Sequence, residues 1–137
     1  MAQAKTLTFV LMDAPFEASR TVSALRIIDA ALRRGCNVNV FAYEGAVYLP
    51  FRHQQPHPNA AHGRDVDEED HPLPREWIAG MIATAAKRKL AFEWVNCGLC
   101  VDERGAADAI DGVRRGTPAD LWTMACASDN TLVVPTA

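Results

Sequence analysis

Residues 6–43 alternate between two apolar patterns, and this alternation constrains the fold more than any other feature of the chain. Residues 6–12 (TLTFVLM) form a nearly continuous apolar run, typical of a strand buried on both faces of a parallel sheet. Over residues 18–34, apolar side chains recur at steps of three and four, which predicts a helix with one apolar stripe. A second strand is predicted over residues 37–43. A strand, a helix and a strand in this order predict that the two strands pair in parallel.

The rest of the chain continues the alternation. Further helices are predicted from Pro74 to residue 89, over residues 102–112 and from Thr117 to Ala127, and further strands over residues 91–97 and 131–134. Thr117-Pro118-Ala119-Asp120 has the form of a capping box at the start of a helix. Together these elements predict a three-layer α/β/α sandwich with a mainly parallel sheet, in a single domain over residues 1–137.

Residues 50–74 interrupt the alternation. This segment is rich in proline, carries an acidic run over residues 65–70 and contains all four histidines of the chain, which are His53, His57, His62 and His71. A loop of this length is uncommon in a compact domain, so we predict an exposed, flexible loop. The histidine spacing matches no known ligand pattern and favours solvated side chains over metal ligands. A histidine acting as general base toward Cys97 is the open alternative.

Composition and charge exclude several classes of protein. The formal net charge is -3, which argues against a nucleic-acid partner because such proteins usually carry a basic face. No apolar run approaches the length of a membrane span, and residues 1–6 do not resemble a signal peptide, so we expect a cytoplasmic protein. The chain has neither a phosphate-binding loop nor a dinucleotide fingerprint, and we expect no cofactor.

The sequence Cys97-Gly98-Leu99-Cys100 is the strongest candidate for chemistry. It follows a predicted strand directly, and in open α/β sheets ligands bind at the carboxyl ends of the strands. Glycine permits a tight turn there, and backbone N–H groups at the turn are expected to favour a thiolate. The pair therefore predicts sulfur chemistry, which requires that the Cys97 thiol can ionise and is accessible at the edge of the sheet.

The spacing of the pair leaves four interpretations open. The cysteines are ordinary buried thiols, or ligands of a zinc ion completed by Cys36, Cys126 or loop histidines, or a dithiol redox centre, or a thiol that carries sulfur as a persulfide. Cys36 and Cys126 are expected to pack in the core. Asp13 ends the first strand, so we expect it near the same sheet edge as Cys97, where its simplest role is turn formation.

Four segments carry a resemblance to a known family. They are residues 21–26 (TVSALR) with residues 32–35 (LRRG), residues 43–48 (YEGAVY), Asn96-Cys97 followed by Arg104-Gly105, and residues 112–117 (GVRRGT). In this order and spacing, the chain resembles the DsrE/DsrF-like sulfur relay family over most of its length, outside the histidine-rich loop. Cys100 and the glycine-free turn over residues 13–17 depart from the family pattern.

The resemblance implies a DsrE-like fold with a parallel sheet of five strands and helices on both faces, in which residues 112–116 supply a short strand. It implies that Cys97 accepts sulfane sulfur and passes it on as a sulfurtransferase, with Cys100 in an assisting or guarding role. It also implies a homo-oligomer, a trimer or hexamer, and a small TusA-like protein as sulfur donor or acceptor. Two other functions remain open: a non-catalytic oligomeric binding or regulatory subunit, and a CxxC dithiol oxidoreductase.

Overall fold

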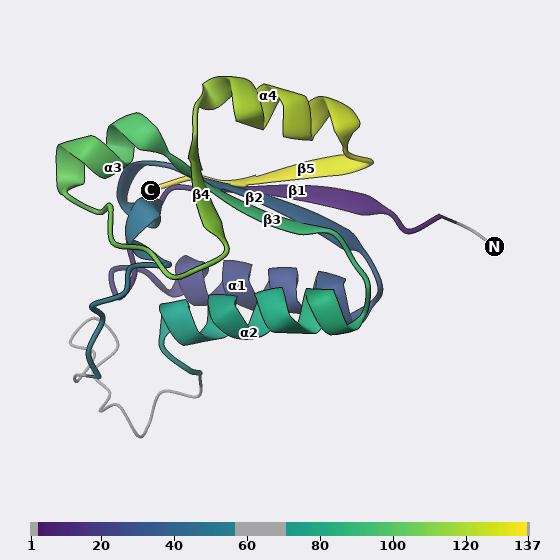
Figure 1. The fold of residues 1–137 in the computed structure, drawn as a ribbon, viewed down its shortest axis with the longest axis horizontal. Helices are drawn as coiled ribbons and strands as arrows, with labels where there is room; N and C mark the ends of the chain where they lie inside the picture. The colour runs from purple at the N-terminus through teal and green to yellow at the C-terminus, as the bar shows by residue number, and fades with distance from the viewer. Residues whose placement is uncertain (1–2, 57–70, 137) are drawn as a thin grey trace.

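A sheet of five parallel strands forms the middle layer of the molecule (Figure 1). The computed structural model describes residues 3–56 and 71–136. The strands are β1 (Thr6–Leu11), β2 (Asn37–Ala42), β3 (Phe92–Cys97), β4 (Val113–Gly116) and β5 (Asn130–Val134), and their order in the sheet is β4-β3-β2-β1-β5. All neighbouring strands pair in parallel. The predicted parallel sheet is confirmed, and so is β4, the strand that the family resemblance implied.

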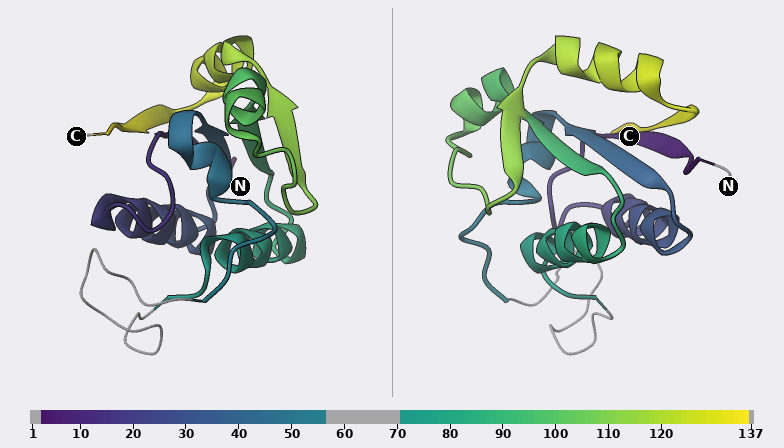
Figure 2. Two further views of the ribbon diagram at one scale, coloured as in Figure 1. Left: turned by 90° about the vertical axis from the view of Figure 1, so that its left-hand side faces the viewer. Right: turned by 45° about the vertical axis from the view of Figure 1, so that its right-hand side comes forward.

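Helices cover both faces of this sheet. The helices α1 (Ser19–Arg33) and α2 (Pro74–Lys87) lie side by side on one face, and α4 (Pro118–Ala127) covers the other (Figure 1). The short helix α3 (Gly98–Arg104) and the 3-10 helix η1 (Glu44–Tyr48) lie next to each other at the carboxyl end of the sheet (Figure 2). The predicted three-layer sandwich is therefore confirmed. None of the helices in the described ranges is long and apolar enough to cross a membrane.

The prediction of a helix over residues 102–112 is wrong. The helix α3 begins at Gly98, immediately after β3, and ends at Arg104. Its end is set by Gly105, whose φ of 64° lies in the left-handed region that glycine adopts without steric cost. The chain after Gly105 is irregular until β4.

The main core lies between the sheet and the α1–α2 layer. Leu25, Ile28 and Leu32 form the buried stripe of α1, as the helical spacing predicts, and each is fully buried. Trp94 of β3 is buried in the same core, and its indole Nε1 donates a hydrogen bond to Asn96 Oδ1 at 3.0 Å. The indole N–H therefore has a partner although no water reaches it.

The described ends of the proline- and histidine-rich segment are tied to the domain. Residues 57–70, which include His57 and His62, lie outside the described residues, and so does most of the predicted flexible loop. At the near end, Arg52 and His53 both contact the carboxylate of Asp108. At the far end, Arg75 donates its backbone N–H to the side chain of Gln54 at 3.0 Å. The two ends of the segment are thus held next to each other.

Candidate functional site

The Cys97–Cys100 pair lies where β3 passes directly into α3. β3 ends at Cys97 and α3 begins at Gly98. A Cβ atom at Gly98 would lie 3.2 Å from Arg115 Nη2 and 3.3 Å from the carbonyl oxygen of Gly116. Arg115 Nη2 also donates to the carbonyl of Gly98 at 3.0 Å. Glycine at this position therefore lets β4 approach the start of α3 and fixes the turn that presents both cysteines.

Cys97 lies at the predicted edge of the sheet but is covered by α4. The residue is 6% exposed and packs in a cluster with Phe41, Val95 and Met124. Leu121 of α4 lies at the border of the same cluster. The expectation of an accessible Cys97 thiol is therefore not met in this structure, because Met124 and Leu121 place α4 over it.

Cys100 is the more accessible thiol of the pair. It is half-buried, and its Sγ accepts a hydrogen bond from the backbone N–H of Glu44 at 3.2 Å. Burial raises the pKa of the Cys100 thiol, and the hydrogen bond and charge of the adjacent Cys97 raise it further. The Glu44 N–H and the Arg104 guanidinium act in the opposite direction on this pKa. None of the four cysteines is in a disulfide bond, and Cys100 packs against the cluster that contains Cys97 and contacts its thiol.

Asn96 fixes the position of the strand end that carries Cys97. Its side chain is buried, and Nδ2 donates to the carbonyl of Val47 in η1 at 3.2 Å. Its Oδ1 accepts the hydrogen bond from Trp94. Sequence analysis assigned no role to Asn96. The signal that could have found it is an amide side chain inside an otherwise apolar run, since a buried amide needs partners of its own.

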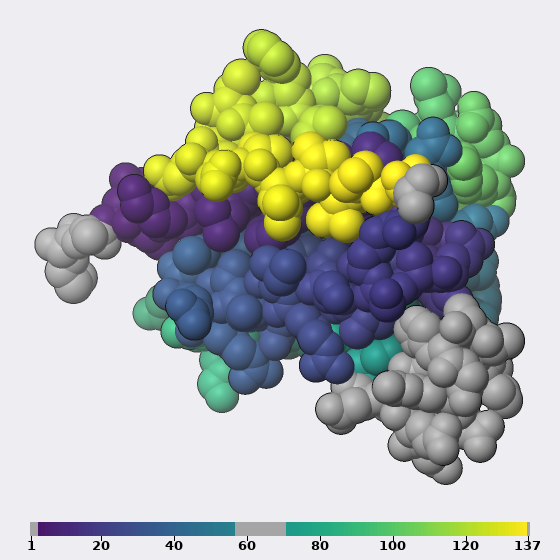
Figure 3. All heavy atoms as spheres, turned by 180° about the vertical axis from the view of Figure 1, so that it is seen from behind, coloured from purple at the N-terminus to yellow at the C-terminus, as the bar shows by residue number. Residues whose placement is uncertain are grey.

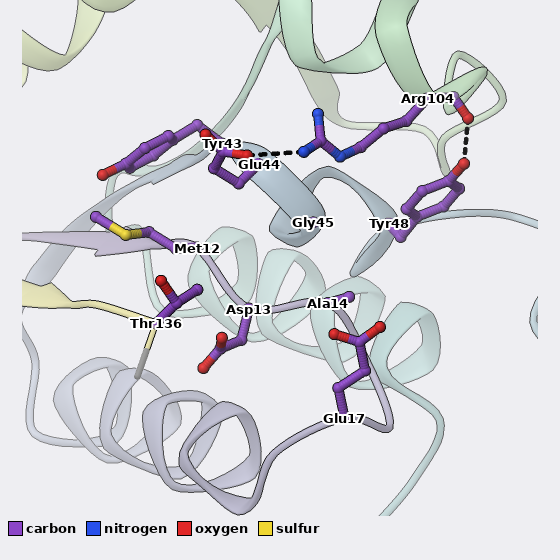
Figure 4. A pocket seen from close by; sticks show the side chains of 10 residues that line it. All are labelled: Met12, Asp13, Ala14, Glu17, Tyr43, Glu44, Gly45, Tyr48, Arg104 and Thr136. Carbon is purple, nitrogen blue, oxygen red and sulfur yellow. Dashed lines mark hydrogen bonds and ion pairs between the residues drawn. The ribbon is translucent and has the colours of Figure 1, made fainter.

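A cavity of about 560 Å³ opens at the carboxyl end of the sheet (Figure 4), and one of its lining residues, Glu44, contacts Cys100 through its backbone N–H. It is lined by residues that follow three strands and by one residue of α3: Met12, Asp13, Ala14, Glu17, Tyr43, Glu44, Gly45, Tyr48, Arg104 and Thr136. The strands β2, β3 and β4 lie on one side of β1 and β5 lies on the other, so the strand order reverses at this point. Open α/β sheets bind ligands at such a reversal. Sequence analysis placed Asp13 at this edge but did not predict the cavity.

The other predicted residues have mixed outcomes. Cys36 packs partly buried against the main core, in line with its predicted structural role. The core assignment of Cys126 is wrong, because this residue lies on the solvent side of α4 while Met124 of the same helix faces the sheet. Asp13 forms an ion pair with Arg20 and is not brought into contact with the cysteines.

The described residues offer no metal centre. Within residues 3–56 and 71–136, no group of three or more histidine, cysteine, aspartate or glutamate side chains is arranged to hold a metal ion. His53 contacts Asp108, and the His71 ring stacks on Trp77 with their centroids 5.8 Å apart. The zinc interpretation of the cysteine pair therefore receives no support from this part of the chain.

A sheet of five parallel strands with two thiols at the end of β3 and a cavity at the strand reversal defines a class of small α/β proteins. The chain belongs to the DsrE/DsrF-like family, whose sequence profile matches residues 5–134. It is 30% identical over 125 residues to the uncharacterized protein MJ0989 of Methanocaldococcus jannaschii, covering 90% of this chain and 94% of that protein. It is 31% identical over 128 residues to the uncharacterized protein MK0008 of Methanopyrus kandleri, covering 92% and 91%.

Solved structures share the fold at low sequence identity. The YchN protein of E. coli aligns with a TM-score of 0.71 at 20% identity, covering 96% of this chain and 100% of that one. MTH1491 of Methanobacterium thermoautotrophicum aligns with a TM-score of 0.59 at 10% identity and the same coverage. These two likenesses concern the fold alone.

Proposed function

We propose that this protein is a cytoplasmic sulfur carrier, in which Cys97 accepts a sulfane sulfur as a persulfide and relays it to a partner thiol. The observation that carries the proposal is the contact between two free thiols at the carboxyl end of β3, beside a cavity at the strand reversal. Membership of the DsrE/DsrF-like family supports this chemistry. The transfer requires neither a metal nor an organic cofactor.

The proposed transfer is an exchange at sulfur. A thiolate of the pair attacks the terminal sulfur of a donor persulfide, a new sulfur–sulfur bond forms, and the donor leaves as a thiolate. The step is redox-neutral, because one sulfur–sulfur bond replaces another. Delivery to a partner thiolate repeats the same exchange in the outward direction.

In this proposal Cys100 receives the sulfur from the donor and Cys97 stores it. Cys100 is the more exposed thiol of the pair, so Cys100 meets the donor first. Cys97 then takes the sulfur and holds it under α4, where burial limits oxidation of the persulfide. A shift of α4, or return through Cys100, releases the sulfur.

Partner proteins follow from the same proposal. A small TusA-like protein is the proposed donor or acceptor, and the chain itself is proposed to form a trimer or hexamer. Exposed apolar side chains on the α4–β5 side, including Trp122, which is 74% exposed, support such contacts.

The experiment that tests the carrier function is whole-protein mass spectrometry after incubation with inorganic polysulfide. The wild-type protein should gain and keep the mass of sulfur, whereas the Cys97→Ala variant should keep less of it, because only the half-buried Cys100 can then hold the persulfide. The Cys126→Ala variant, which removes an exposed thiol away from the site, is the matched control and should load like the wild type. The Cys100→Ala variant should load more slowly to the same final extent. Equal loading of Cys97→Ala and wild type would contradict the proposal.

A dithiol oxidoreductase is the second candidate function, and the contact between Cys97 and Cys100 is the observation that favours it. In that case a disulfide between them is the working state. The Cys100→Ala variant would then lose all activity, in contrast to the slower loading that the carrier function predicts. Partner binding that persists in full without either thiol would indicate a non-catalytic subunit.

A further inference from the structure

The cavity at the strand reversal shares its wall with the cysteine pair. Glu44 lines the cavity with its side chain and donates its backbone N–H to Cys100 Sγ at 3.2 Å. Arg104 lines the same cavity, and its charge acts on the Cys100 thiol. Cys100 itself does not line the cavity, so the sulfur end of a bound molecule would reach this thiol past Glu44.

The charged side chains that line the cavity include more carboxylates than the neighbouring arginines neutralise. Asp13 is neutralised by Arg20, and the carboxylate of Glu44 accepts a hydrogen bond from Arg104 Nη2 at 2.7 Å. Glu17 lines the cavity and forms no ion pair with another residue in the described ranges. The cavity therefore carries an excess negative charge, which favours a cationic ligand over an anionic one.

One aromatic side chain of the cavity lies across from the carboxylates. Tyr48 is on the wall opposite Asp13 and Glu17, whereas the Tyr43 ring points away from them (Figure 4) and packs against the cluster that contains Cys97. The Tyr48 hydroxyl donates to the backbone carbonyl of Arg104, which ties η1 to the end of α3. A short aliphatic chain that ends in an ammonium group would place its carbons against the Tyr48 ring and its charge toward the carboxylates.

Two residues beside the cavity have a positive φ, a backbone conformation that is sterically unfavourable for residues other than glycine. Phe16 has a φ of 71° and Glu44 a φ of 52°. Such conformations persist where the surrounding structure enforces them, and they cluster at ligand sites. At Glu44 the conformation belongs to the residue that joins the cavity to the Cys100 sulfur.

Building on the sulfur-carrier function, we propose that this cavity binds the carrier half of a small persulfide donor with a primary ammonium group, and that Glu17 is its counter-charge. A cavity of about 560 Å³ is large enough for a molecule of this size. In the transfer, the Cys100 thiolate attacks the terminal sulfur of the bound persulfide, the sulfur–sulfur bond of the donor breaks, and the aminothiolate leaves from the cavity. The Cys97 thiolate then takes the sulfur and restores the Cys100 thiolate.

The test compares three donors of similar size and different charge. These are the persulfides of 2-aminoethanethiol, 2-mercaptoethanol and mercaptoacetate, and the rate of sulfur loading is followed by protein mass. The ammonium donor should load fastest and the carboxylate donor slowest. The Glu17→Gln variant should raise KM for the ammonium donor about threefold and leave kcat and the neutral donor unchanged. Glu76→Gln on α2 makes the same charge change away from the cavity and should behave like the wild type.

The outcomes distinguish failure of the cavity proposal from failure of the sulfur-carrier function on which it rests. Equal rates for the three donors, or equal kinetics of the Glu17→Gln and Glu76→Gln variants, would overturn the inference and leave the carrier function standing. If no donor loads the protein, the carrier function fails and the inference fails with it. Binding without transfer is tested with 2-(methylthio)ethylamine and a Cys97→Ala/Cys100→Ala protein. NMR signals of Gly45 and Tyr48 should shift with this probe, and Glu17→Gln should raise the probe concentration needed for half of the shift about threefold. A probe that leaves these signals unmoved would also overturn the inference.

Discussion

Cys97 and Cys100 are separated by two residues but have different surroundings. Cys97 is closed in by apolar side chains under α4, whereas Cys100 is half-buried and in contact with the backbone of Glu44. A buried sulfur is shielded from oxidants, and a half-exposed one can reach a donor. The proposed transfer assigns different roles to the two thiols on the basis of this difference in burial.

Selective alkylation should reveal this difference. Burial raises the pKa of Cys100, so its thiolate forms at higher pH than the thiolate of a free cysteine. With short pulses of iodoacetamide, labelling of Cys100 should keep increasing at a pH where labelling of N-acetylcysteine has levelled off. The Arg104→Gln variant removes a charge that lowers this pKa, so its Cys100 should react more slowly at neutral pH. Peptide mass spectrometry measures each rate.

Two results would contradict this account of the residues. One is a Cys100 labelling profile that levels off at or below the pH of N-acetylcysteine. The other is faster labelling of Cys97 than of Cys100, because the α4 side chains should exclude the reagent from Cys97. Exposed Cys126 supplies the internal reference for reagent access.

At the level of the elements, the β1–α1 connection can pack closely against η1 because Gly45 of η1 has no side chain. A Cβ atom at Gly45 would lie 2.8 Å from Ala14 Cβ and 3.0 Å from the Ala14 backbone nitrogen. Both residues line the cavity. The close approach therefore sets the distance across the cavity between the β1–α1 connection, which carries Asp13 and Glu17, and η1, which carries Tyr48.

The Gly45→Ala variant should be less stable than the wild type by about 1–3 kcal/mol, because the added methyl group must push the two loops apart. Gly80→Ala is the matched control. Gly80 lies inside α2 with no atom within 4 Å of an added Cβ, so alanine there should stabilise the protein by about 0.5–1 kcal/mol. Urea denaturation measures both effects. A Gly45→Ala variant as stable as Gly80→Ala would contradict the close packing of the loops.

Periodicity predicted the long elements well and the short ones poorly. The helices α1, α2 and α4 and the strands β1, β2 and β3 each carry a repeated apolar pattern along several residues. β4 is a strand of four residues (VRRG) at the sheet edge, too short and too polar to show a pattern. The start of α3 was missed because Gly98 suggests a turn, although here it permits the approach of Arg115.

The sequence predicted the cysteine pair of the candidate site but not the residues that surround it, because those residues are distant in the chain. The position of the cysteine pair follows from local sequence, since a strand end and its next residues are neighbours. Glu44 meets Cys100 across 56 residues of chain and Arg104 across 60 residues. Asn96 meets Val47 across 49 residues. No spacing rule joins positions so far apart, and only the parallel pairing of β2 with β3 brings their ends together.

At the scale of the whole molecule, one side of the surface is markedly apolar. Trp122 on α4 is 74% exposed, and Leu132 and Val133 on β5 are 44% and 49% exposed. Figure 3 shows α4 and β5 next to each other at the surface. Exposed apolar groups gathered in this way mark surfaces that bind other proteins, and β5 is also an edge strand. We expect subunits to meet on this α4–β5 side.

Light scattering after size-exclusion chromatography tests this expectation. The native mass should be a multiple of the 15.0 kDa chain mass, and Trp122→Lys should shift the protein toward the monomer. Ile27→Lys is the comparison, because Ile27 is 48% exposed on α1, which covers the face of the sheet opposite α4 (Figure 1). A wild-type monomer at micromolar concentration would contradict the proposed assembly. Equal dissociation by both substitutions would place the contact elsewhere.

The central claim is that sulfur comes to rest on Cys97, the thiol that α4 covers. The most direct measurement is peptide mass spectrometry of the polysulfide-loaded protein after rapid alkylation, which assigns the additional sulfur to one cysteine. The account predicts an alkylated persulfide on Cys97 and, at early times, a smaller amount on Cys100. Additional sulfur found only on Cys126, or a Cys97–Cys100 disulfide with no persulfide at any time, would contradict it.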